Sequence, residues 1–147
     1  MNLCQWLFTS LGLATIFSLG VGACSCGETT SIEDLEQPTF VWTYYDGNCS
    51  TIHAMDAQGR IWFDHGCEDG GTELSRNGSR DITAVTAAFA ALPWGTPRPD
   101  FATCSGRTHE FEILTNPVQR TGACATNTQG DASDLTSPWR EAAVAVK

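Results

Sequence analysis

The chain has 147 residues and a formal net charge of −9, from 17 acidic and 8 basic residues. Its single lysine is Lys147, and a chain with so few basic residues lacks the Lys and Arg clusters that nucleic acids and anionic membrane surfaces require. Hydrophobic residues make up 41% of the sequence, which excludes a disordered chain, and the length predicts a single domain.

The first 23 residues contain no charged side chain. An export signal has an apolar core of roughly 7–15 residues followed by small residues at the cleavage site. Leu7–Leu19 supplies the apolar core, and Gly20, Gly22 and Ala23 supply the small residues. We therefore predict a signal peptide over residues 1–23. Because no Lys or Arg precedes the apolar core, an uncleaved amino-terminal anchor is the alternative.

The four residues Val21-Gly22-Ala23-Cys24 at the end of this segment resemble the lipobox of bacterial lipoproteins. The resemblance implies cleavage between Ala23 and Cys24 and a diacylglyceryl group on Cys24, which would anchor the protein to a membrane. Ser25 in the next position implies sorting to the outer membrane. An ordinary secretory cleavage after Ala23, which would give a soluble secreted protein, is the alternative.

The cysteine count bears on both alternatives. The seven cysteines are Cys4, Cys24, Cys26, Cys49, Cys67, Cys104 and Cys124. Removal of the signal peptide leaves six, which can all pair if Cys24 carries no lipid. If Cys24 is lipidated, five remain and Cys26 is the odd one. In either case the count predicts an oxidising compartment.

Residues 24–38 are polar and acidic and lack periodic apolar positions, so we expect a flexible tether there. The folded domain is expected to span residues 39–147. Its first element is a strand at Phe40–Tyr45, which is aromatic and β-branched and is followed by the turn residues Asp46, Gly47 and Asn48.

The next two segments, 51–55 and 60–64, flank Asp56-Ala57-Gln58-Gly59 and predict a β-hairpin. If Asp56 lies opposite Arg60, the same register places Cys49 directly opposite Cys67. Opposed residues on antiparallel strands are close enough for a disulfide, so the spacing predicts the Cys49–Cys67 bond.

In that register His53 and His65 lie on the same face of the hairpin as Cys49 and Cys67. Two Cys and two His are a ligand set for tetrahedral zinc. An oxidising compartment favours the disulfide over thiolate ligands, so His53 and His65 are only candidate metal ligands and no bound metal or other cofactor is predicted.

Gly70–Gly78 is predicted to be a loop. A helix is predicted over Asp81–Leu92, because four apolar residues recur there at helical spacing and Ser79 or Asp81 can cap the first turn. These apolar residues are Ile82, Val85, Phe89 and Leu92. Pro93 ends the helix.

A second hairpin is predicted from Thr108–Leu114 and Val118–Cys124, with His109 and Phe111 on one face and Glu110 and Glu112 on the other. Cys104 and Cys124 bracket this unit and are predicted to pair. Ser137 and Pro138 predict the start of a short carboxy-terminal helix.

The order of elements predicts an α+β fold, a small antiparallel sheet of β-hairpins with one main helix packed on a face and stabilised by disulfides. The sequence contains no nucleophile-elbow, phosphate-loop or dinucleotide-binding motif, and we assign no catalytic residue.

The function expected from these features is interaction or structure at the cell envelope, with an unknown protein or glycan as partner. Five aromatic residues could contribute a contact patch: Trp42, Tyr44, Tyr45, Trp62 and Trp94. One alternative is a small hydrolase or metal-binding protein that uses His53, His65 or His109. The Glu110 and Glu112 carboxylates also match the residue type used in glycoside hydrolysis. Another alternative is a secreted protease inhibitor.

Overall fold

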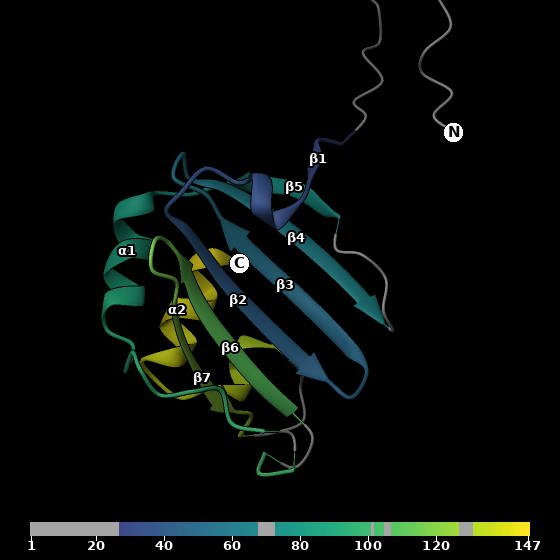
Figure 1. Ribbon diagram of the computed structural model, residues 1–147, viewed down its shortest axis with the longest axis vertical. Helices are drawn as coiled ribbons and strands as arrows, with labels where there is room; N and C mark the ends of the chain where they lie inside the picture. The colour runs from purple at the N-terminus through teal and green to yellow at the C-terminus, as the bar shows by residue number, and fades with distance from the viewer. Residues whose placement is uncertain (1–26, 68–72, 101, 105–106, 127–130) are drawn as a thin grey trace, which may run out of the picture.

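The computed structural model describes residues 27–67, 73–100, 102–104, 107–126 and 131–147. These residues form one antiparallel sheet of seven strands in the order β1-β5-β4-β3-β2-β6-β7 (Figure 1). The strands are β1 (Thr29–Thr30), β2 (Thr39–Asp46), β3 (Cys49–Met55), β4 (Arg60–Cys67), β5 (Leu74–Ser79), β6 (Arg107–Leu114) and β7 (Gln119–Cys124).

Strand β2 lies between β3 and β6 and is buried on both faces from Thr39 to Tyr44. Phe40, Trp42 and Tyr44 point to the helix-side face of the sheet, where they join the main hydrophobic core. Val41 points to the opposite face, which we call the outer face, and belongs to a second core. Because side chains alternate along a strand, β2 supplies both cores.

Local turn chemistry fixes the β3–β4 hairpin. The Asp56 carboxylate is fully buried and accepts hydrogen bonds from the backbone N–H groups of Gln58 and Arg60, from Arg60 Nε and from Trp62 Nε1. Burial acts to raise the pKa of Asp56, but these hydrogen bonds outweigh it and lower the pKa. The predicted register is confirmed, with Met55 opposite Ile61 and Cys49 opposite Cys67.

Two α-helices, α1 (Ile82–Ala90) and α2 (Trp139–Val146), cover part of the helix-side face (Figure 1). Asp81 caps α1 by accepting a hydrogen bond from Thr83 N at 2.9 Å. The predicted apolar stripe of α1 packs against β2 through Val85 and Phe89. Two short 3₁₀ helices, η1 (Ile32–Asp34) and η2 (Ala132–Asp134), complete the fold.

The α+β class and the disulfides agree with the sequence prediction, but two details of the architecture differ from it. The sheet is continuous and dominates the fold, and two helices rather than one pack on it. The sequence predicts α2 only as a short terminal element. It buries Ala142, Ala143 and Val146 in the main core, since its small side chains allow close approach to the sheet.

The prediction of a flexible tether over residues 24–38 is wrong for its described part from Thr29 onward. Strand β1 pairs with β5, and Glu28 forms an ion pair with Arg76 at 2.7 Å. Leu35 is 6% exposed and packs on the outer face with Val41 and Trp62. Strand pairing, an ion pair and the packing of Ile32 and Leu35 therefore hold this polar segment on the sheet.

The loop prediction for Gly70–Gly78 is also wrong over residues 74–78, which belong to β5. Only Leu74 is buried in β5, and the other five residues are exposed. The strand therefore has no alternating apolar signal. Backbone pairing with β4 and β1 holds it in the sheet.

Replacement of Leu35 by alanine tests whether this amino-terminal segment is part of the fold. We expect Leu35→Ala to lower the free energy of unfolding by about 2–3 kcal/mol, because the buried side chain leaves a cavity. Glu33→Ala, an exposed change in the same segment, should stay within about 0.5 kcal/mol of the parent. Urea titration measures both, and equal small effects would contradict the packing of this segment.

Candidate functional site

The helix-side face carries three consecutive rows of polar and aromatic side chains across β6, β2, β3 and β4. The first row, whose Phe111 and Trp42 belong to the main core, consists of Phe111, Trp42, His53 and Phe63. The second row is His109, Tyr44, Thr51 and His65. The third row is Arg107, Asp46, Cys49 and Cys67. All three histidines of the chain thus lie on one face in adjacent rows. The face becomes more polar with distance from the core.

Trp42 lies between two histidine rings. His53 stacks on the indole with ring centroids 5.0 Å apart, and His109 stacks at 6.0 Å. His53 also contacts Phe63, and His109 contacts Tyr44. His53 is 6% exposed and His109 is fully buried, so both histidines are core residues.

The hydrogen bond from Trp42 Nε1 to His109 Nδ1, 3.1 Å long, fixes the tautomer of His109. An indole N–H only donates, so Nδ1 accepts and the proton of the neutral ring lies on Nε2. Neither His109 Nε2 nor His53 Nδ1 has a hydrogen-bond partner among the described residues. Both rings are therefore held mainly by aromatic packing.

Burial lowers the pKa of His53 to about 4, and the positive charge of Lys147 acts in the same direction. Burial also lowers the pKa of His109 to about 4, with Asp131 opposing the effect. A general base works best when its pKa lies near the operating pH. Buried imidazoles with a pKa of about 4 are poorly suited to that role.

His65 differs from the other two histidines because it is exposed. Its Nδ1 lies 2.8 Å from Thr51 Oγ1, on the part of β4 that projects past the helices. His53 and His65 share a face as predicted, but one is in the core and the other at the surface. Within the described ranges, no three His, Cys, Asp or Glu side chains are grouped to hold a metal ion.

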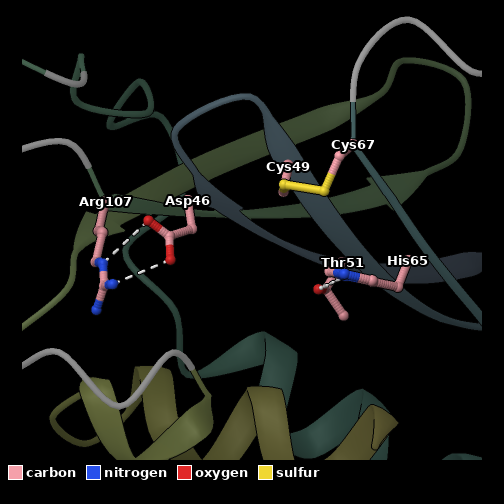
Figure 2. Close-up of a disulfide and its surroundings, with 6 residues drawn as sticks. All are labelled: Asp46, Cys49, Thr51, His65, Cys67 and Arg107. Carbon is pink, nitrogen blue, oxygen red and sulfur yellow. Dashed lines mark hydrogen bonds and ion pairs between the residues drawn. A yellow bond between two sulfur atoms is a disulfide. The ribbon is translucent and has the colours of Figure 1, made fainter.

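The structure contains disulfides at both predicted pairs, Cys49–Cys67 and Cys104–Cys124. Cys67 is exposed and Cys49 is half-buried, whereas Cys104 is 5% exposed. Figure 2 shows the Cys49–Cys67 bond between the hairpin strands, with Asp46 on the Cys49 side. Arg107 binds Asp46 there through two contacts of 3.2 and 3.0 Å.

The carboxylates of Glu110 and Glu112 lie on the outer face, as predicted, and each is paired with an arginine. Glu110 accepts a hydrogen bond from the Tyr45 hydroxyl at 3.2 Å and lies 3.6 Å from Arg98. Arg120 Nε donates to Glu112. Two carboxylates that are each bound to an arginine are poorly suited to act as the acid and base of a glycosidase.

Most of the aromatic residues considered for a contact patch belong to the cores. Trp42, Tyr44 and Trp62 are buried. Trp94 is half-buried and donates to Phe89 O at 3.0 Å, and Tyr45 is half-buried beneath Arg98. These five residues therefore form no common surface.

A different surface is open on the helix-side face. In Figure 1, α2 lies behind β2, β6 and β7 and α1 lies to their left, while β4 and β5 extend away from both helices. Half-buried Phe63 lies there, opposite exposed Ser75 on β5, and exposed His65 follows two residues later. We call Phe63, His65 and Ser75 the uncovered strip. Sequence reasoning missed it because helix coverage depends on tertiary packing.

Comparisons with protein-family models, curated proteins and solved structures gave no match. The segment Val21–Cys24 and the cleavage point between Ala23 and Cys24 lie outside the described residues, as does Cys26. Among the described helices, none is both long enough and apolar enough to span a membrane.

The buried histidines predict loss of stability in mild acid. An unfolded histidine binds a proton near its ordinary pKa of 6.5, whereas His53 and His109 in the folded chain do so only near 4. As pH falls from 6.5 to 4, the unfolded state therefore gains protons that the folded state does not. Each histidine should lower the free energy of unfolding by about 3 kcal/mol across this window.

Urea titration at pH 7.5, 5.5 and 4.5 measures this loss. His53→Phe keeps a ring against Trp42 without a titrating group and should remove about half of the histidine-dependent slope. Val144→Ala, an exposed change that involves no titrating group, should leave the slope unchanged. A slope that His53→Phe does not alter would contradict the assignment of His53 as a buried neutral ring.

Proposed function

We propose that this chain is an exported binding domain, held at the bacterial cell envelope by lipid on Cys24 with the outer membrane as its site. Two disulfides support export, because such bonds persist in oxidising compartments. The resemblance of Val21–Cys24 to a lipobox supports the anchor. The partner is a protein or a glycan.

The proposed binding role rests on the exposure of the uncovered strip. The core beside it encloses two of the three histidines. His53 and His109 are buried, and Glu110 and Glu112 are ion-paired. In contrast, Phe63, His65 and Ser75 combine a partly exposed aromatic ring with hydrogen-bonding groups on a sheet face that neither helix covers. Such mixed surfaces suit recognition more than acid–base catalysis.

The intact mass of the mature protein tests the anchor. We expect a chain that begins at Cys24, carries the mass of a diacylglyceryl group, and has Cys26 as its free thiol. Cys24→Ser should abolish the added mass and release the protein from the membrane fraction. A mature chain that begins at Cys24 with three disulfides and no lipid would refute the anchor while leaving export intact.

Binding to isolated cell envelopes tests the role of the uncovered strip, with the lipid-free Cys24→Ser protein as the probe. Adding His65→Asp and Ser75→Asp should weaken binding at least about tenfold, because two charges would flank Phe63. The control is Val144→Asp, which places a charge on the exposed side of α2 and should leave binding unchanged. Treating the envelopes with protease or with a glycan hydrolase identifies the partner class. If the strip and control variants bind equally, the strip is not the contact surface.

A further inference from the structure

The Cys49–Cys67 disulfide differs from Cys104–Cys124 in its access to solvent. The two bonds close chain segments of nearly equal length, with sequence separations of 18 and 20 residues. Their loop-entropy contributions are therefore nearly the same. What separates them is exposure, since Cys67 is at the surface and Cys104 is buried. Exposed disulfides are the ones that take part in thiol exchange.

The two sulfurs of the exposed bond also differ from each other. Because Cys49 and Cys67 are directly opposed, the bond runs across the hairpin from β3 to β4. A thiolate attacks a disulfide sulfur from the side opposite the bond that breaks. Behind Cys49 in the same row lies Asp46, which Arg107 holds in place (Figure 2). Cys49 is half-buried and has the Asp46–Arg107 pair as its neighbour on that side, so it is the less accessible of the two sulfurs.

The far side of Cys67 is more open in the described part of the chain. Strand β5 pairs with β4 only from Arg60 to Phe63, so no described strand flanks β4 at Cys67. Among the described residues, the main core on this face ends one row earlier, at Tyr44. The attack that the geometry favours is thus on Cys67.

We propose that Cys67 is a site of mixed-disulfide formation with an external thiol, either a small molecule or a cysteine of a redox protein. The thiolate forms a new sulfur–sulfur bond with Cys67, the Cys49–Cys67 bond breaks, and Cys49 leaves with the electron pair and takes a proton from water. A second thiol, on the same donor or on a second donor molecule, can then release Cys67 as a thiol, and the two donor sulfurs are left joined in a disulfide.

Exchange at this site opens only the end of the hairpin. The β3–β4 pairs from Ser50–Gly66 to Met55–Ile61 remain, and the main core lies beyond them. The altered end adjoins His65 in the uncovered strip. Covalent attachment at Cys67 would therefore place the thiol donor beside the proposed contact surface without unfolding the domain.

Stepwise reduction of the mature protein tests the order of opening. Existing thiols are first blocked with one isotopic form of N-ethylmaleimide, and graded dithiothreitol is then followed by the other form and peptide mass spectrometry. Cys49 and Cys67 should be labelled at dithiothreitol concentrations at least about tenfold below those needed for Cys104 and Cys124. Tryptophan fluorescence should stay native at the lower concentration.

Limiting reduced glutathione tests which sulfur is attacked. We expect glutathione on Cys67 and maleimide on Cys49, at least about fivefold in excess of the converse pair. Opening of both disulfides over one concentration range, earlier opening of Cys104–Cys124, or loss of native fluorescence with the first bond would overturn the local-exchange proposal. Glutathione mainly on Cys49 would overturn the assignment of Cys67.

Discussion

The burial of β2 on both faces is the constraint on which the rest of the structure depends. Six consecutive residues, Thr39–Tyr44, are enclosed between β3 and β6 and between the two cores. A shift of one residue would exchange Phe40, Trp42 and Tyr44 with Val41 and Thr43, placing bulky rings on the outer face. The register of β2 therefore determines which side chains of β3 and β6 face the helices.

That register explains why the three histidines do not act alike. Trp42 opposite His53 and Phe111 puts one imidazole under the helices, and Tyr44 opposite His109 buries a second. His65 lies in the same row as His109, but strands β2 and β3 separate the two, and helix cover has ended at β4. One face thus supplies both a buried interior, in which the imidazoles are neutral, and a solvent-exposed margin.

The sequence predicts local features better than distant ones. The Asp56 turn specifies the hairpin by itself, so the opposition of Cys49 and Cys67 could be inferred from spacing. The pairing of β2 with β6 joins residues more than 60 positions apart, and no local signal predicts that Trp42 donates to His109 or that Asp46 binds Arg107. Strands β1 and β5 were missed for a related reason, because their place in the sheet depends on backbone pairing rather than on an apolar pattern.

The disulfide and the ion pair occupy the row where apolar packing stops. One row nearer the helices, Tyr44 is still in the main core, whereas Asp46, Arg107, Cys49 and Cys67 have no core contact of that kind. Strands that extend beyond their packed face would fray unless other interactions held them. Here an arginine–carboxylate pair links β2 to β6 and a covalent bond links β3 to β4. The ion pair and the disulfide hold this end of the sheet in place of apolar packing. Breaking the Cys49–Cys67 bond should therefore loosen this end of the sheet and leave the core around Trp42 intact.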